Sequence, residues 1–248
     1  MRRDTRIATS TPYIHIAMIT KDRSGSNDVT PLLVWLSPAF PVGSYAYSHG
    51  LEWAVEAGDV HDAASCQAWI ADLLAQGGLW SDAVLLAATH FAVSARHDAK
   101  LAEIAELAAV LAPSRERRLE TLNQGAAFLA AIRGAWPAPA LERAARFESA
   151  IAFPVAVGLA AAAHGLAVLP TLEAYLVATA ANLVSAAVRL IPLGQTDGSR
   201  VVAALVPQAK QVATRAASST LDDLGGATLR SDIASMRHET QQTRLFRS

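Results

Sequence analysis

The sequence predicts an all-α protein, organised as a single-domain bundle of about ten helices. Apolar residues recur at intervals of three and four along most of the chain, which is the period of an amphipathic helix. Alanine, the strongest helix former, supplies much of a hydrophobic share that reaches 52%. No strand run or internal repeat interrupts this pattern. The 248 residues divide into a flexible N-terminal arm (1–30), a helical domain (31–217) and a C-terminal tail (218–248).

The first 30 residues are polar and are broken by proline, glycine and serine, apart from an apolar patch at Tyr13–Ile19. This composition favours a poorly ordered arm over a strand. The next segment, Leu32–Leu36, is apolar but too short to distinguish a helix from a strand. Its secondary structure is therefore left open.

The stretch Ser37–Glu52 is the point around which the N-terminal half is organised. Its two prolines fix φ and predict extended backbone before the glycine at position 43. Ser44 is then expected to cap a helix that continues to Ala57, and Gly58 is placed to end it in a left-handed conformation.

That helix would carry Tyr45, Ser48 and Glu52 near one face, with Tyr47 and Leu51 on another. Tyrosines and a histidine near a helix start serve either as packing or as a recognition surface. The residues alone favour packing.

Further helices are indicated by capping residues and helical spacing. Gly77 and Gly78 separate the first two of them, and Pro113 ends the third. The first of these helices is expected to begin after a cap at Asp62. The next three are expected over 81–95, 101–111 and 114–134, and a short helix is expected from Pro139 to about Glu148.

An uncharged run separates Glu148 from Glu173, so a membrane span has to be weighed. Prolines and glycines punctuate the run and alanine dominates it, which favours a buried core helix instead. Small residues at Gly158, Ala162 and Gly165 would allow close approach of neighbouring helices.

Two long helices are expected after this run. The first, Thr171–Leu190, is apolar nearly all round and is therefore predicted to be buried. The second is expected to be capped by Thr196 or Asp197 and kinked at Pro207. Residues 218–226 read as a loop, and residues 231–239 as a capped turn of helix.

The composition excludes several functional classes. A formal net charge of −1 gives no support for nucleic-acid binding. The single cysteine, Cys66, excludes an internal disulfide and any cysteine-based metal cage, and it is compatible with a reducing cytoplasm. No secretory signal is evident at the beginning of the sequence.

No motif in the sequence predicts an active site. The phosphate-loop, dinucleotide and hydrolase patterns are absent, and the histidines show no metal-ligand spacing. The local carboxylates Glu52, Glu56, Asp59 and Asp62 are read as a solvated helix face. We therefore expect no catalytic residue, no metal site and no cofactor.

Two charged features remain unusual. The terminal run Arg244–Arg247 sets leucine and phenylalanine between two arginines, a composition that favours docking on the chain's own domain or on a partner. Arginines also crowd the first turn of the helix after Ser114, against the helix dipole, which hints at an external acidic partner.

Several segments, in this order, resemble the UreF family of urease accessory proteins. One such match would be weak, but the ordered set is highly specific and leaves only the first 30 residues without a counterpart. The segments are LLVWLSPAFPVGSYAYSHGLE at 32–52, SRER at 114–117, NQG at 123–125, FPVAVG at 153–158, LGQTDG at 193–198 and DIASMRHETQQTRLFRS at 232–248.

The resemblance implies a cytoplasmic, all-helical homodimer without catalytic activity. It implies a chaperone subunit that bridges the scaffold protein UreD (also called UreH) and the GTPase UreG, in the complex that inserts nickel into apo-urease. No membrane or nucleic-acid partner is implied. The GTPase face maps to Tyr45, Ser48 and Arg244, and the scaffold face to Met236, His238, Leu245, Phe246 and Arg247.

Two other functions stay open. The protein could regulate GTP hydrolysis by UreG, because an arginine supplied in trans accelerates such reactions. Arg117, Arg118 and Arg244 are the candidates for that role. The uncharged run at 149–172 leaves a binder of an apolar ligand or a membrane as a third class.

Overall fold

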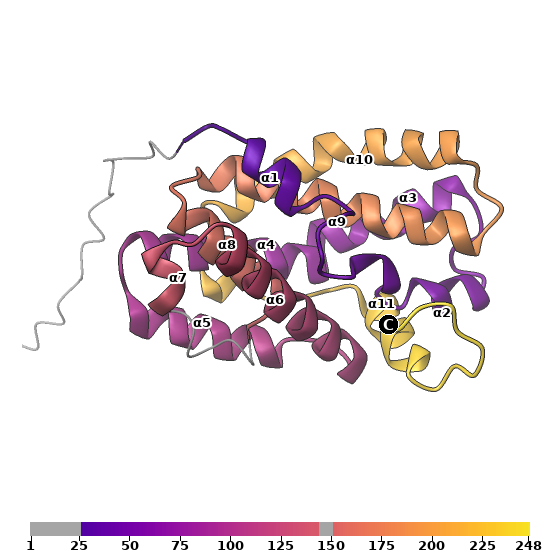
Figure 1. Ribbon diagram of the computed structural model, residues 1–248. Coiled ribbons are helices and arrows are strands. Elements are labelled where there is room, and N and C mark those ends of the chain that lie inside the picture. The colour runs from indigo at the N-terminus through magenta and orange to yellow at the C-terminus, as the bar shows by residue number, and fades with distance from the viewer. Residues whose placement is uncertain (1–25, 144–150) are drawn as a thin grey trace, which may run out of the picture.

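The computed structural model describes residues 26–143 and 151–248, and within these ranges its regular secondary structure is helical apart from one isolated bridge between Ser26 and Leu166 (Figure 1). The all-α prediction is confirmed. The apolar patch at Tyr13–Ile19 and most of the N-terminal arm predicted at 1–30 lie outside the described residues. The elements are α1 (Thr30–Trp35), η1 (Ser44–Ala46), α2 (Leu51–Glu56), α3 (Ala63–Gln76), α4 (Gly78–Ser94), α5 (Asp98–Val110), α6 (Arg115–Ala135), α7 (Pro139–Arg143), α8 (Phe153–Ala163), α9 (Val168–Leu190), α10 (Gln195–Ala216), η3 (Leu221–Asp223) and α11 (Leu229–His238).

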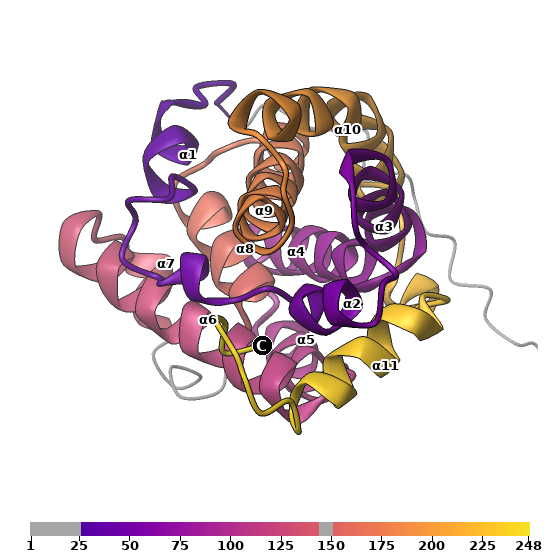
Figure 2. The ribbon, with the colours of Figure 1, turned by 90° about the vertical axis from the view of Figure 1, so that its right-hand side faces the viewer.

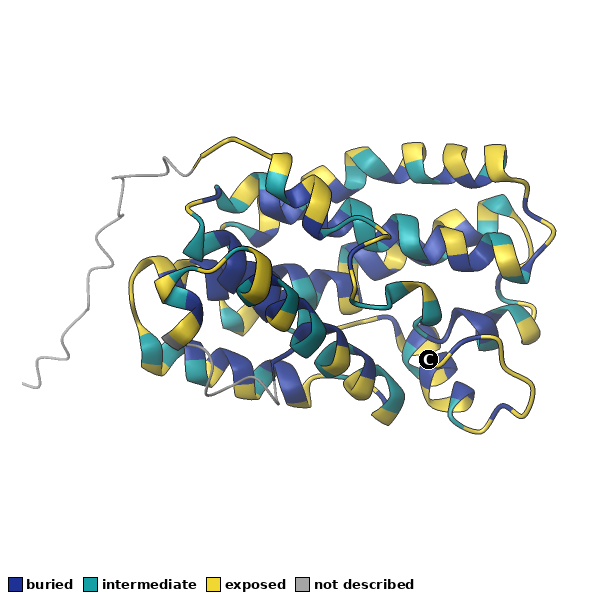
Figure 3. Ribbon diagram, in the orientation of Figure 1, coloured by how far each residue is buried: buried dark blue, intermediate teal, exposed yellow. Residues whose placement is uncertain are grey.

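Helices α8, α9 and α4 form the centre of the bundle, and the other helices surround them (Figure 2). Helix α8 packs along α4 and α6, while α9 packs along α10. All residues from Pro154 to Ala161 are buried, and the buried faces of the outer helices turn toward this centre (Figure 3). The core is therefore one continuous apolar cluster.

The close approach of α8 and α4 depends on a glycine. A Cβ atom added at Gly158 would lie 2.6 Å from the carbonyl oxygen of Leu86. This confirms the close approach predicted at Gly158. Gly165 acts differently, because its φ of 68° places it in the left-handed region just after α8 ends.

Two stretches, Ala63–Ser94 and Val168–Leu190, are long and apolar enough to cross a membrane by length and composition. The first comprises α3 and α4, which Gly77 separates with extended backbone. Their most apolar windows are 61% and 50% buried within the bundle, as core helices of such composition are.

The helix expected from Ser44 to Ala57 is wrong. The chain makes a 3₁₀ turn, η1, then extends at Tyr47, and α2 starts only at Leu51. His49 and Gly50 both have positive φ, which no helix accommodates. Tyr45, Ser48 and Glu52 therefore share no helix face, although Tyr47 and Leu51 are buried as predicted.

Some of the other helix boundaries match the capping residues in the sequence, and others do not. Leu32–Leu36 lies mostly in α1, Asp62 caps α3 in a capping box, and the Ser114 hydroxyl accepts the amide of Arg117 at the start of α6. The cap predicted at Thr196 or Asp197 is wrong, because α10 already begins at Gln195 without a side-chain cap. Helix α11 is also longer than the single turn expected.

Candidate partner-binding site

The terminal segment, residues 239–248, folds back from α11 and lies against α2, η1 and the start of α6 (Figures 1 and 2). Gly50 permits the close packing of α11, since a Cβ atom at Gly50 would lie 2.6 Å from the backbone nitrogen of Ser235 in α11. Its φ of 77° also favours glycine. Helix α11 therefore packs directly against the left-handed turn before α2.

The Glu52 carboxylate holds the backbone of the terminal segment. Its two oxygens accept the amides of Leu245 at 2.6 Å and Phe246 at 2.9 Å. Glu52 is only 7% exposed, so these charge-assisted hydrogen bonds are shielded from water. The carboxylate read from sequence as part of a solvated face is instead buried.

His238 connects this carboxylate to a second one. Its Nε2 lies 3.2 Å from Glu52 and its Nδ1 lies 2.6 Å from Glu116. The imidazole therefore bridges the two carboxyl groups through both of its ring nitrogens. The other oxygen of Glu116 accepts a hydrogen bond from Arg244 at 2.6 Å. Two carboxyl groups, one imidazole and one guanidinium therefore hold the terminal segment.

The last residue of the sequence is buried at a third carboxylate. The backbone nitrogen and hydroxyl of Ser48 donate to the carbonyl of Ser248 at 2.7 and 2.5 Å. The hydroxyl of Ser248 donates to Glu120 at 2.5 Å. We call Glu52, Glu116 and Glu120 the carboxylate cluster, because each contacts α11 or the terminal segment.

Glu120 is ionised despite its burial. Desolvation alone would raise the pKa of its carboxyl, but the Arg117 guanidinium, which forms an ion pair with it, and His49 at 2.8 Å lower that pKa to about 2. Arg117 is nearly buried too, so it is not free to act as an arginine finger on a GTPase.

Behind this pair lies a deeper polar contact. The hydroxyl of Tyr175 donates to Asp82 at 2.8 Å, and burial raises the pKa of both groups. Cavities of about 50 and about 140 Å³ flank the contact, and both are lined by His49, Asp82 and Arg117. Polar side chains thus continue from the terminal segment into the bundle.

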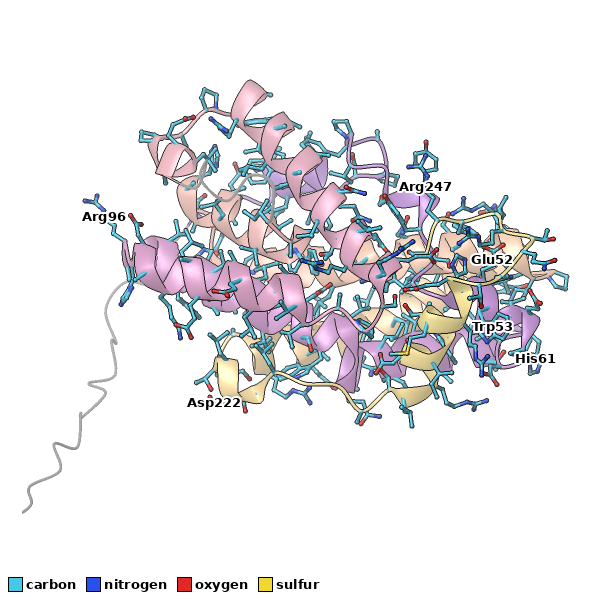
Figure 4. The ribbon with its side chains drawn as sticks, turned by 90° about the horizontal axis from the view of Figure 1, so that it is seen from below. Glu52, Trp53, His61, Arg96, Asp222 and Arg247 are labelled. Carbon is cyan, nitrogen blue, oxygen red and sulfur yellow. The ribbon has the colours of Figure 1, made fainter. Side chains whose placement is uncertain are left out.

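Tyr45 lies beside the terminal segment. The carbonyl of Ala46 accepts the amide of Arg247 at 2.9 Å, and the carbonyl of Tyr45 accepts a hydrogen bond from Arg189 at 2.9 Å. The Arg189 guanidinium also stacks 4.3 Å from the centre of the Phe246 ring. Residues from opposite ends of the sequence therefore meet at one end of the molecule, where Figure 4 labels Glu52 and Arg247.

Among the described residues, no group of three histidine, cysteine, aspartate or glutamate side chains is arranged to hold a metal ion. Hydrogen bonds and ion pairs instead use the carboxylates and imidazoles of this region to fix the chain.

Comparison with known proteins identifies the family. A family model described as UreF matches residues 60–206. The urease accessory protein UreF of Xanthobacter autotrophicus is 58% identical over 219 residues, covering 88% of this chain and 90% of the relative. The chain belongs to the UreF family. The UreF proteins of Bradyrhizobium sp. and Methylobacterium radiotolerans are 52% and 56% identical, over 97% and 88% of this chain and 99% and 95% of their own.

These matches confirm the resemblance and extend it. The Bradyrhizobium UreF aligns over 241 residues, so most of the first 30 residues have a counterpart, contrary to the sequence analysis. The family model itself spans neither Tyr45 nor the terminal segment.

The residues singled out from the UreF resemblance gather at this end but differ in exposure. Tyr45 is 67% exposed and Leu245 is 62% exposed. Arg244, Arg247 and Met236 are exposed as well. Ser48, His238 and Phe246 are buried beneath them.

Sequence reasoning missed the residues that hold the terminal segment, namely the carboxylate cluster, His49 and Arg189. Glu52 and Glu116 do stand within segments that carried the UreF resemblance. Only contacts with residues more than 100 positions away reveal their role.

Proposed function

We propose that this chain is a non-catalytic chaperone subunit of urease maturation, acting as a cytoplasmic homodimer. It bridges the scaffold protein UreD and the GTPase UreG in the complex that inserts nickel into apo-urease. Membership of the UreF family supports this proposal. The observation that carries it is the terminal segment, which is fixed by buried carboxylates while its outer side chains stay exposed.

The exposed side chains divide between the two partners in this proposal. Tyr45 and Arg244 contact the GTPase, and Met236, Leu245 and Arg247 contact the scaffold. An aromatic residue, arginines and a methionine are the side chains that interface centres favour. Ser48, His238 and Phe246 contribute from beneath, because their burial keeps the outer residues in place.

Co-expression with UreD and UreG, followed by size-exclusion chromatography, tests the bridge. The full chain is expected to elute with both partners, while a chain lacking 244–248 loses UreD. The matched control is Arg244→Lys, which keeps the segment and the charge beside Glu116. A truncated chain that still binds UreD at full strength contradicts the assignment of the scaffold face.

A second candidate is regulation of GTP hydrolysis. Arg244 is exposed and Arg118 is too, whereas Arg117 is committed to Glu120 inside the bundle. A turnover assay with UreG distinguishes the two functions. If Arg244 acted as an arginine finger, Arg244→Lys would lower stimulated hydrolysis by a factor on the order of 10³. Unchanged hydrolysis on addition of the wild-type chain removes this candidate.

A further inference from the structure

A groove lies between α3 and the start of α11, outside the site of the terminal segment. Its volume is about 340 Å³, which is within the range of about 300–1,000 Å³ that ligand pockets occupy. Trp69, Asp72 and Gln76 line it from α3, where their spacing places them on one face of the helix. Leu229 and Arg230 line it from α11. We call this feature the α3–α11 groove.

The α3–α11 groove contains a carboxylate that the chain does not neutralise. Asp59 lines the groove too, but it forms an ion pair with Arg230. Asp72 is exposed, and its side chain makes no hydrogen bond or ion pair with any residue that the structure describes. One negative charge of the groove is therefore available to a ligand.

Two polar groups of the lining residues are buried without a partner. The indole N–H of Trp69 and the hydroxyl of Thr228 have no hydrogen-bond partner among the described residues. Thr228 is only 8% exposed. Buried polar groups are nearly always hydrogen-bonded in folded proteins. Both groups can donate to a carbonyl oxygen, and Asp72 can accept from a cationic group, so the groove matches a protein segment that offers both.

The α3–α11 groove is continuous with an exposed apolar face of α11. Leu229, Ile233 and Met236 are four and three positions apart, so they lie on one face of that helix. Their exposed fractions are 69%, 45% and 52%. Helix α11 lies at the surface of the bundle (Figures 2 and 4). Leu229 lines the groove, and Met236 is a residue that we assign to the scaffold protein. The same partner can therefore cover both.

We propose that the α3–α11 groove receives a basic side chain of the scaffold protein UreD. This inference rests on the proposed function and adds a face of α3 to the surface assigned to that partner. Arginine is the best match, because a guanidinium binds a carboxylate and also packs against an aromatic ring. The chain itself contains such a contact, where Arg215 stacks 3.6 Å from the centre of the Trp80 ring. A metal ion is a poorer match, since the described residues include no group of three ligating side chains.

The experiment measures the dissociation constant of the full chain for UreD at about 50 and about 300 mM NaCl. Asp72→Lys reverses the unpaired charge without breaking a described side-chain contact. We expect it to raise the dissociation constant at least about tenfold at the lower salt and less at the higher, because like charges then face each other. Asp72→Asn keeps the shape and should give a smaller increase.

Asp222→Lys is the matched control, because Asp222 is also exposed but lies in η3, away from α11 (Figure 4). It should leave the dissociation constant unchanged. Equal effects of Asp72→Lys and Asp222→Lys overturn the inference. So does an Asp72→Lys chain that binds UreD normally but no longer recruits UreG, since the groove would then serve the GTPase.

A failure of the proposed function gives a different result. In that case the wild-type chain does not bind UreD at either salt concentration. Thermal unfolding of the three variants verifies that each one is folded.

Discussion

Two regions of the molecule are stabilised by different interactions. One is the contact between α4 and α8, and the other is the site where the terminal segment docks. At the first, Gly158 lets two helices meet with only apolar or hydrogen-bonded groups between them. At the second, buried carboxylates bind backbone amides, an imidazole and arginines. The first depends on shape, whereas the second depends on protonation.

This difference separates stability from recognition. Apolar packing is indifferent to pH and resists local opening, while a segment held by charged hydrogen bonds can open alone. The terminal segment contributes few buried apolar side chains, chiefly Phe246. We therefore expect conditions and substitutions that release the terminal segment without unfolding the bundle.

The largest expected effect is acid destabilisation through Glu120. Its pKa is lowered from 4.5 to about 2, so it stabilises the folded chain above its unfolded pKa, and this contribution is lost as pH falls from about 4.5 to about 2. The loss is about 3 kcal/mol at about 1.4 kcal/mol per pKa unit. Asp82 acts in the opposite direction, because burial raises its pKa. Urea unfolding across this pH range measures the difference.

The control for this prediction removes both members of the buried pair. Arg117→Met with Glu120→Gln removes both charges of this ion pair and should reduce the change in the free energy of unfolding between pH 4.5 and 2. A wild-type free energy of unfolding that stays constant between pH 4.5 and 2 contradicts the assignment.

The fold was predictable because most of its signals are local. Asp62 and Ser114 cap helices with their own neighbours, and helical periodicity carries the rest. The Ser44–Ala57 helix failed for a non-local reason. Gly50 adopts its positive φ where α11 packs on it, and nothing near it in the sequence records that contact.

The site was predictable only in part. Resemblance to a family indicated Tyr45 and Arg244, and the structure brings both to one end. Glu52 was assigned to solvent because helical spacing shows which carboxylates are neighbours but not which distant amides they bind. Whether a charged side chain of this chain is buried depends on its tertiary contacts, which helical spacing does not show.

The second effect tests the helix contact by shape. Gly158→Ala places a Cβ within 2.6 Å of a backbone oxygen, so α8 and α4 must separate, at a cost of about 2 kcal/mol. Gly134→Ala is the matched control in α6, where no atom lies within 4 Å. It should gain about 0.5–1 kcal/mol from helix propensity. Denaturant unfolding distinguishes the opposite signs, and two equal changes would refute the close-contact argument.

The third effect is local. Glu52→Gln keeps the shape but replaces the carboxylate, whose two oxygens accept one amide each, with a neutral amide that has only one accepting oxygen. Protection of the Leu245 and Phe246 amides against hydrogen exchange should fall at least about tenfold, which corresponds to about 1.4 kcal/mol. Glu103→Gln, on the exposed face of α5, should leave both amides unchanged. Equal protection in all three proteins would show that packing alone holds the terminal segment.

The smallest expected effect gives the sharpest separation of the two regions. Cys66 is fully buried in α3, and burial raises the pKa of its thiol to about 11. A thiol reagent at about pH 8 therefore reacts with Cys66 only when the bundle opens. We expect Glu52→Gln to label as slowly as the wild type, and Gly158→Ala to label faster. Rapid labelling of Glu52→Gln would mean that release of the terminal segment opens the core, so that the two regions unfold as one unit.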